Sequence, residues 1–436
     1  MVRLTRIQQQ ARTRALVLAA AKAEFVQHGY ALAKVDRIAE RAELTRGAVY
    51  SNFPSKRALY LAVLVDTIEN AGADASPETA ELDAPPPAPR TPADALGRFA
   101  RTWLERLPMG DASAADGRLQ LRSLLGVFDD EQGRTVLAQL ARLEALLLAL
   151  GLEYCEPDDA APRRVRLAEL ALTLLSGSAY LAELAPGFGD PFDQTRACRQ
   201  LAGLELDDIW APSHLPYTEP AEPCRESWDA PTGVVDELTG DAVDLGADGL
   251  ITVLGAHRLA AAEEAVRAAR PGEQVTVVVV TSDPAETGNL VRLRIRDLAA
   301  CLRRVFPPGA WQQIRLVIDD EAKMSTAVGQ SDGDGDGAQE STALRQSEDD
   351  EAKMSTAAGR TGGSGAQGAT TVGQLGGDGE DPVSTAVGRS GGGDESEAAV
   401  RIHGGSIVAR SFGRGAGHAV SGTGTSAATP QREATT

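Results

Sequence analysis

The sequence predicts a mainly α protein: a three-helix head and a helical-bundle body, followed by a small α/β module and a disordered tail. Apolar residues recur at three- and four-residue steps over 12–62 and 92–205, as amphipathic helices require. Within 233–320, three β-rich runs alternate with helical segments, which favours parallel strands joined by helices. From residue 321 the chain is rich in Gly, Ser and Asp and repeats itself.

Three helices are expected in the head, and a fourth, capped by Ser55, follows them. The first covers 12–28, and Gly29 suits the left-handed residue that ends it. The second covers about 35–42 and the third about 46–52, with a tight turn between them. Thr45 is a good N-cap for the third helix, because its hydroxyl can accept a bond from an unpaired backbone N–H group.

Composition divides the rest of the chain. Leucines at helical spacing indicate the body, five prolines mark a linker, and the tail holds a single aromatic residue. Such a tail cannot bury enough apolar surface to offset the entropy of ordering. The predicted domains are therefore a head over 1–60, a body over 61–211, a Pro-rich linker over 212–232, an α/β module over 233–320 and a disordered tail over 321–436.

The charge is unevenly distributed. The whole chain carries a net charge of −19, but residues 1–60 hold eleven Lys or Arg against four Asp or Glu, a net charge of +7. A basic head on an acidic body can contact phosphate while the body stays in solvent. The alternative is a chance excess of arginine on a surface helix.

No metal or cofactor is predicted. The four cysteines lie far apart, without the spacing of a zinc site. Residues 332–337 imitate the start of a calcium loop, but its twelfth position is Ala343 instead of glutamate. A basic and apolar leader is absent, as is any apolar run of about 18 residues, so we expect a cytoplasmic protein without a membrane span.

One run of residues points to a function. The sequence RGAVYSNF at Arg46–Phe53, with Ser55, Lys56 and Leu59 behind it, resembles the helix-turn-helix of the TetR/AcrR family of bacterial transcriptional regulators. The match spans about 12–62 and also includes Phe25, Gly29, Tyr30, Ile38, Ala39 and Ala42. The resemblance implies a TetR-type DNA-binding head on a helical body that forms a homodimer and binds a small-molecule effector. It implies a regulator, most often a repressor, and not an enzyme.

In a helix-turn-helix the second helix enters the major groove of duplex DNA. Arg46, at the start of that helix, is expected to reach a guanine edge, and Thr45 to bind phosphate at the helix N-terminus. Tyr50 and Lys56 resemble the family's phosphate contacts, although Tyr50 could instead be a core aromatic residue. The full set of expected DNA contacts is Lys34, Thr45, Arg46, Gly47, Ala48, Tyr50, Ser51, Asn52 and Lys56.

The chain departs from the family pattern at two positions. Hydroxyl residues are usual before the second helix, whereas this chain has Ala33 and Lys34, so a side-chain cap is missing. Lys34 could take a phosphate instead. The turn usually carries glycine, and here it is Glu43, which a positive φ would strain.

The body offers candidates for both further roles. The aromatic residues Trp103, Phe128, Tyr154 and Tyr180 could line an effector pocket, or simply fill the core. The small residues 176–179, in a helix over 164–184, would let a second copy approach, together with 191–203; packing within one chain is the alternative.

A different class of function is also open. The protein could be an enzyme or an interaction scaffold centred on 233–320, with an accessory DNA-binding head. Polar residues at 281–283 and 319–320 follow predicted strands, where α/β proteins place sites. They form neither a nucleophile–base pair nor a metal cluster, so the role of the module stays open.

Overall fold

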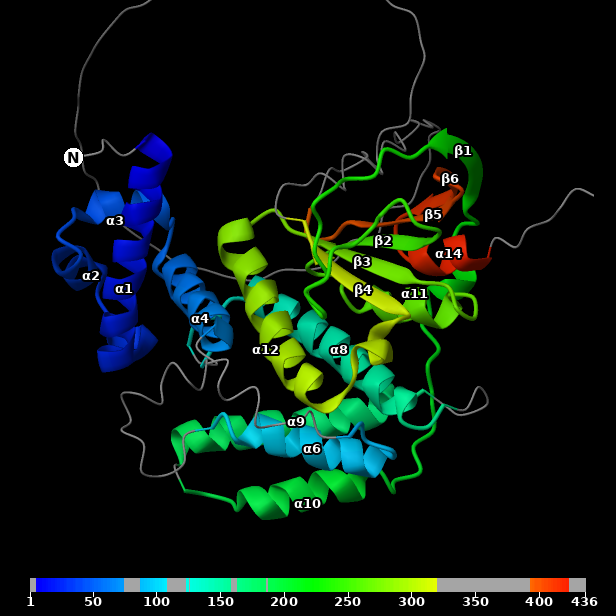
Figure 1. Ribbon diagram of the computed structural model, residues 1–436, viewed down its shortest axis with the longest axis horizontal. Helices are drawn as coiled ribbons and strands as arrows, with labels where there is room; N and C mark the ends of the chain where they lie inside the picture. The colour runs from blue at the N-terminus through cyan, green and yellow to red at the C-terminus, as the bar shows by residue number, and fades with distance from the viewer. Residues whose placement is uncertain are drawn as a thin grey trace, which may run out of the picture. The chain divides into compact units, whose positions relative to one another are not determined.

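The computed structural model describes residues 5–73, 87–107, 123–124, 126–157, 163–185, 187–319 and 393–422. These residues belong to one compact unit. They form a helical head, a helical body and a mixed β-sheet with its own helices (Figure 1). The calcium-like run at 332–337 lies outside the described residues.

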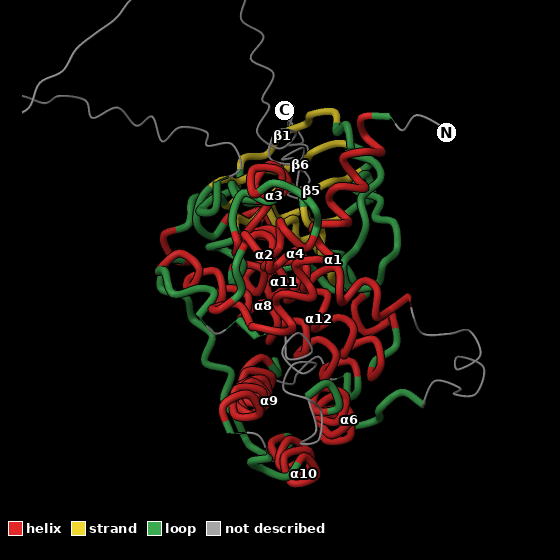
Figure 2. Tube along the Cα trace, turned by 90° about the vertical axis from the view of Figure 1, so that its left-hand side faces the viewer, coloured by secondary structure: helices red, strands yellow, loops and turns green. Residues whose placement is uncertain are grey.

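The three predicted helices of the head are confirmed, and so is the fourth, which connects the head to the body. They are α1 Arg6–Leu32, α2 Val35–Arg41, α3 Arg46–Asn52 and α4 Lys56–Ala73 (Figure 2). α1 begins earlier than predicted, because Thr5 and Gln8 form reciprocal capping bonds. It bends at Gly29, whose φ of 69° glycine adopts without steric cost.

The turn between α2 and α3 has the strain that the sequence predicts. Glu43 adopts a φ of 56°, and no other non-glycine residue in the described ranges has a positive φ. Thr45 then caps α3, since its Oγ1 accepts a hydrogen bond from the Ala48 N–H at 3.2 Å. Buried Val49 fixes the helix to the core of the head.

Among the described residues, four helices form the body: α6 Pro92–Leu104, α8 Glu131–Tyr154, α9 Val165–Leu184 and α10 Pro191–Leu201. Figure 2 shows α6, α9 and α10 grouped together. The long helix α8 buries Leu140, Leu143 and Leu147. It packs on α9 and also on α12 Asn289–Val305 of the region that contains the β-sheet, so the body and this sheet region share one apolar core.

The sheet has six strands in the order β1-β6-β5-β2-β3-β4. In chain order they are β1 Glu222–Ser227, β2 Gly249–Gly255, β3 Val275–Val280, β4 Ile314–Ile318, β5 Glu397–His403 and β6 Ser406–Phe412. β2, β3 and β4 run parallel, whereas β5, β6 and β1 pair antiparallel. The accompanying helical segments are η1 Leu215–Tyr217, α11 Ala261–Ala268, η2 Pro284–Gly288, α12 Asn289–Val305, η3 Pro308–Trp311 and α14 Ala416–Gly422.

Successive side chains of β2 enter two different apolar clusters, as the two-residue period of a strand requires. Leu250 and Leu254 join the large core shared with α11, α12, α14 and the body. Ile251 and Val253 join a smaller cluster with Trp228. The three helices therefore cover one face of the sheet, and the chain around Trp228 covers the other.

The predicted bounds of the α/β module, 233–320, are too narrow. β1 comes from the predicted linker, while β5, β6 and α14 come from the predicted tail. The prediction of disorder is therefore wrong for 393–422. Gly404 and Gly405, at φ of 58° and 72°, form the turn of a hairpin between two strand-length runs. The average composition of the tail conceals these runs, because the low-complexity residues before them outnumber them.

Candidate nucleic-acid interface

The first turn of α3 is exposed, and it carries the residues that the sequence assigns to base contacts. The Arg46 side chain is 60% exposed, and its Nη1 lies 3.3 Å from Oδ1 of the equally exposed Asp36. Its guanidinium also lies over the Tyr50 ring, 5.5 Å from the centroid. An exposed ion pair is worth at most about 1 kcal/mol, so Arg46 can leave Asp36 for a stronger partner.

Gly47 is not required by the packing of the protein. A Cβ added there would meet only the Thr45 Oγ1, at 3.9 Å. Any need for a small residue at this position must therefore come from outside the chain, as the expected close approach to DNA would supply.

The polar groups at the end of α3 are turned back on the helix itself. The Ser51 hydroxyl and the Asn52 side-chain amide both donate to the Ala48 carbonyl, at 2.9 Å each. Arg14, which the sequence places in a basic arm, donates to the Asn52 carbonyl at 3.3 Å and covers the Phe53 ring at 4.4 Å. The Ser51 and Asn52 side chains thus bond within α3, and Arg14 holds the end of α3 against α1.

Lys56 bonds to the end of α1, whereas the Lys34 side chain at the start of α2 is exposed to solvent. The Lys56 Nζ donates to the Ala31 carbonyl at 3.2 Å and lies 4.8 Å from the Tyr30 ring centroid. Partial burial lowers the pKa of Lys56. Lys34 is exposed and makes no side-chain cap on α2, as predicted from the missing hydroxyl.

A carboxylate that the sequence analysis missed binds the start of α2. Glu24 is fully buried, and its Oε1 accepts the Lys34 backbone N–H at 3.2 Å. Arg37 and Arg41 approach the same carboxylate at 3.5 and 3.6 Å. The signal was present in the sequence: Glu24 falls on the inward stripe of α1, three residues after Ala21. Glu24 joins α1 to α2 and so helps to fix α3.

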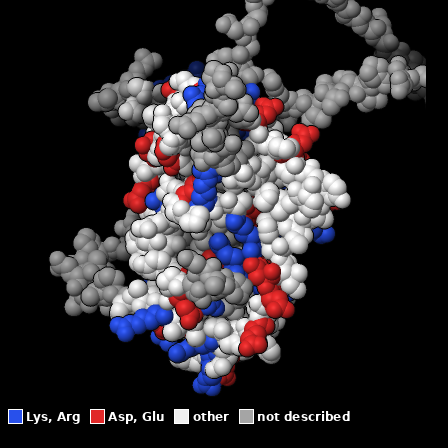
Figure 3. Space-filling view, turned by 90° about the vertical axis from the view of Figure 1, so that its right-hand side faces the viewer, with Lys and Arg blue, Asp and Glu red and all other residues white. Residues whose placement is uncertain are grey.

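The face shown in Figure 3 differs from the head in its charge. Lys and Arg side chains there lie among Asp and Glu side chains. Among the described residues drawn on that face, the two signs are interspersed, which suits solvation better than contact with a polyanion.

The four aromatic residues assigned to an effector pocket do not lie together. Trp103 and Tyr180 line a cavity of about 340 Å³ between α6, α8, α9 and α12. Phe128 instead packs beneath the Arg57 guanidinium, 5.0 Å from its ring centroid, and Tyr154 lies beside Gly309. The cavity also contains residues that the sequence analysis did not name, among them Arg106, Leu293 and Arg294.

Polar residues after the C-terminal end of β3 bind the start of 393–422, a segment that the sequence predicts to be disordered. Thr281 and Ser282 donate through their hydroxyls to Asp394, at 2.7 and 2.9 Å. Within the described ranges, no group of three His, Cys, Asp or Glu side chains is arranged to hold a metal ion. The Asp394 carboxylate is already occupied by these bonds, which support the sheet.

The head matches a known family. The model for bacterial regulatory proteins of the tetR family matches residues 17–63. Residues 17–63 are a TetR-family helix-turn-helix domain. This TetR-type head includes α2, α3 and the first turns of α4. No curated protein matches the chain.

Solved structures of bacterial regulators are similar to this chain at low identity. A TetR transcriptional regulator from Rhodococcus sp. RHA1 is 18% identical with a TM-score of 0.28, over 46% of this chain and 99% of that one. SmeT, the repressor of the Stenotrophomonas maltophilia efflux pump SmeDEF, is 20% identical with a TM-score of 0.29, over 46% and 94%. FadR from Bacillus subtilis, in complex with stearoyl-CoA, is 14% identical with a TM-score of 0.26, over 43% and 96%. Each match covers less than half of this chain.

Proposed function

We propose that the chain is a cytoplasmic transcriptional regulator that binds double-stranded DNA in a sequence-specific way, as a ligand-responsive repressor. The observation that carries this proposal is the exposed first turn of α3 in the TetR-type head, with Arg46 and Gly47 outward and Val49 inward. Such a helix can enter a major groove and present a guanidinium to base edges. Lys34, Thr45, Tyr50 and Lys56 would contact the phosphates on either side.

A homodimer on a pseudo-palindromic operator is supported by the outer face of α9. Leu170, Leu181 and Leu184 are exposed there by 41%, 36% and 58%, and a Cβ at Gly177 would meet open space. α8 and α9 are both long and apolar enough to cross a membrane, but α8 is a core helix. α9 is only one-third buried over its most apolar window, which suits a partner helix. Of the small residues 176–179, only Gly177 belongs to this face, since Ser178 is buried and Ser176 and Ala179 line the cavity.

The cavity between α6, α8, α9 and α12 is the candidate effector site. Trp103, Leu137 and Leu293 supply apolar walls, and Arg106 and Arg294 supply polar groups. A volume of about 340 Å³ is within the range of small-molecule sites. An effector would act by preferring the state of the body in which the two heads do not fit the operator.

The test is enrichment of duplexes from a random-sequence library by the native protein. We expect an enriched motif with two inverted half-sites about one helical turn apart, as two symmetric heads require. Arg46→Ala should enrich a motif that is degenerate at one base pair of each half-site. A library that emerges without any enriched motif would contradict sequence-specific binding, and an enriched motif without symmetry would contradict the dimer.

A further inference from the structure

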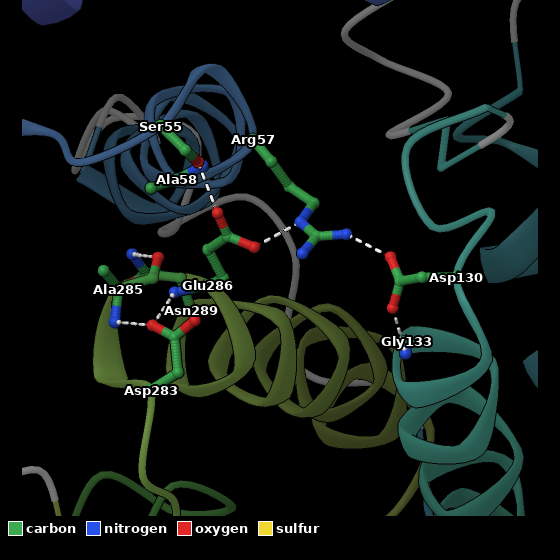
Figure 4. Close-up of polar contacts among 9 residues, drawn as sticks. All are labelled: Ser55, Arg57, Ala58, Asp130, Gly133, Asp283, Ala285, Glu286 and Asn289. Atoms are coloured by element: carbon green, nitrogen blue, oxygen red, sulfur yellow. Dashed lines mark hydrogen bonds and ion pairs between the residues drawn. The ribbon is translucent and has the colours of Figure 1, made fainter. Parts of the chain in front are cut away.

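The beginning of α4, where the head joins the body, is held by a side chain from the sheet region. Ser55 Oγ and Arg57 Nε both donate to the carboxylate of Glu286, which lies in η2 between β3 and α12 (Figure 4). Glu286 is more than 200 residues away in sequence. Ser55 also caps α4, because its Oγ accepts the Ala58 N–H at 2.9 Å. Glu286 thus binds both the cap and the first turn of the helix that carries the head.

Arg57 joins this contact to a third element. Its Nη1 donates to Asp130, the N-cap of α8, which accepts the Gly133 N–H at 2.7 Å (Figure 4). The Gly133 N–H and Arg57 together lower the pKa of Asp130. The starts of α4, α8 and α12 therefore meet at one guanidinium, which packs on the Phe128 ring.

Glu286 is itself fixed in place. Asp283 Oδ1 accepts the backbone N–H groups of Ala285 and Glu286 at 3.1 and 3.0 Å. The Asn289 side chain donates to the Ala285 carbonyl at 2.8 Å. The Glu286 side chain is only 13% exposed. Because both the backbone and the carboxylate oxygens of Glu286 are held, a movement of η2 should move Ser55 and Arg57 with it.

Helix α12, which follows η2 directly, is anchored on the body and lines the cavity. Arg294 makes a two-pronged ion pair with buried Glu144 of α8, at 2.5 and 2.7 Å, and Asp297 pairs at 2.7 Å with Arg106, which follows the end of α6. Arg296 contacts Glu69, so α12 reaches α4 at a second point. α12 and α4 lie side by side in Figure 1 and pack on each other.

The junction leads directly into the core of the head. Tyr60, one turn after Arg57, lies 4.9 Å from the Phe25 ring and 5.1 Å from the Tyr30 ring. Any shift at the start of α4 is therefore passed to α1, on which α2 packs, and α3 packs on α2 in turn.

We propose that the sheet region sets the position of the DNA-binding head, with Glu286 as the positioning residue that acts through Ser55 and Arg57. This inference rests on the proposed function and adds a control input that the TetR-type head does not contain. A head held in one position binds two half-sites without first being ordered, so that loosening it should cost affinity for specific DNA.

The test compares full-length native protein with Glu286→Ala, Glu286→Gln, Arg57→Ala and the Arg57→Ala/Glu286→Ala double variant. Two probes are used at about 100 mM salt, a duplex enriched by the native protein and a mixed-sequence duplex of equal length. Arg304→Ala is the matched control, because it removes an exposed ion pair of α12 with Glu105 of the body and leaves α4 untouched. Thermal unfolding of each variant confirms that it is folded at the assay temperature.

We expect Glu286→Ala to weaken binding to the enriched duplex tenfold or more and to leave mixed-sequence binding unchanged. Glu286→Gln should lose less, because it can still accept from Ser55. The double variant should lose less than the sum of the two single losses, since Glu286 and Arg57 share one contact, although Glu286 also binds Ser55 and Arg57 also binds Asp130. Arg304→Ala should bind like the native protein.

Folded Glu286→Ala with native affinity for the enriched duplex would overturn the positioning role. So would additive losses in the double variant, or equal losses on both duplexes. If the native protein enriches no duplex at all, the proposed function itself fails, and the positioning role falls with it.

Discussion

The head and the sheet region are stabilised by contacts of very different sequence range. In the head, the Thr45 hydroxyl accepts an N–H group three residues away, and the Glu24 carboxylate accepts one ten residues away. In the sheet region, Arg258 binds Glu397 across 139 residues, and β2 lies between β3 and β5. A motif built from near neighbours can be recognised in a sequence, whereas a sheet closed by a distant hairpin cannot. The head and the sheet region should therefore lose different amounts of stability when single contacts are removed.

The largest expected effect comes from ending the chain after residue 392. This change removes β5, β6 and α14, so β2 loses its neighbour β5 and becomes an edge strand, and α11 loses its contact with α14. We expect the sheet region to lose cooperative unfolding altogether, measured in urea by the fluorescence of Trp228 and Trp311. A chain that ends after residue 422 is the control and should unfold like the native protein. Native unfolding of the shorter chain would show that the hairpin is dispensable.

The next effect is at Glu397, whose buried carboxylate accepts four hydrogen bonds. Arg258 donates at 2.7 and 3.1 Å, and the N–H groups of Gly415 and Ala416 donate at 2.6 and 3.2 Å. We expect Glu397→Gln to lower the free energy of unfolding of the sheet region by about 3–5 kcal/mol, because Arg258 loses its charged partner. Glu395→Gln, at a carboxylate that is 77% exposed, should change it by less than about 1 kcal/mol. Similar losses in both variants would argue against Glu397 as an anchor.

A smaller effect is expected at the buried carboxylate of the head. Glu24→Gln keeps an acceptor for the Lys34 N–H but removes the attraction of Arg37 and Arg41. Because those two arginines are nearly half exposed, we expect a loss of about 1–2 kcal/mol in head stability, measured by hydrogen exchange in α1 and α2. Exposed Glu40→Gln is the control. If the amides of α1 and α2 exchange at the same rates in Glu24→Gln and in the native protein, the Glu24 charge does not stabilise the head.

The smallest effect should be a gain. Glu43→Gly relieves a φ of 56° and should stabilise the head by about 0.5–1 kcal/mol in the same exchange measurement. Glu43→Ala keeps the unfavourable φ and should give no gain. A gain with alanine as large as with glycine would mean that the carboxylate, and not the backbone, is the source of the strain.

Sequence reasoning worked where the determinants are local. The three head helices and the Thr45 cap follow from neighbouring residues, and the missing cap at Lys34 and the strain at Glu43 follow from comparing those residues with the TetR pattern. It failed for β5 and β6, because a composition average over the tail concealed a Gly404–Gly405 hairpin.

The junction at Arg57 could not be foreseen from the sequence. Nothing within α4 indicates that Glu286 or Asp130 would lie beside it, since both approach only through tertiary packing. The residues predicted to line an effector pocket lie apart for the same reason. Their spacing in the sequence does not show that Trp103 lines a cavity while Phe128 packs beneath an arginine.

The central claim is that Arg46 reads bases while Lys56 contacts phosphate. The most direct measurement is the affinity of native, Arg46→Ala and Lys56→Ala proteins for the enriched and the mixed-sequence duplex, between about 50 and 200 mM salt. We predict that Arg46→Ala loses about 1–3 kcal/mol on the enriched duplex beyond any loss on the mixed-sequence one. Lys56→Ala should lose equally on both and lower the salt slope by about one. An Arg46→Ala protein that loses equally on both duplexes, or on neither, would contradict base reading by α3.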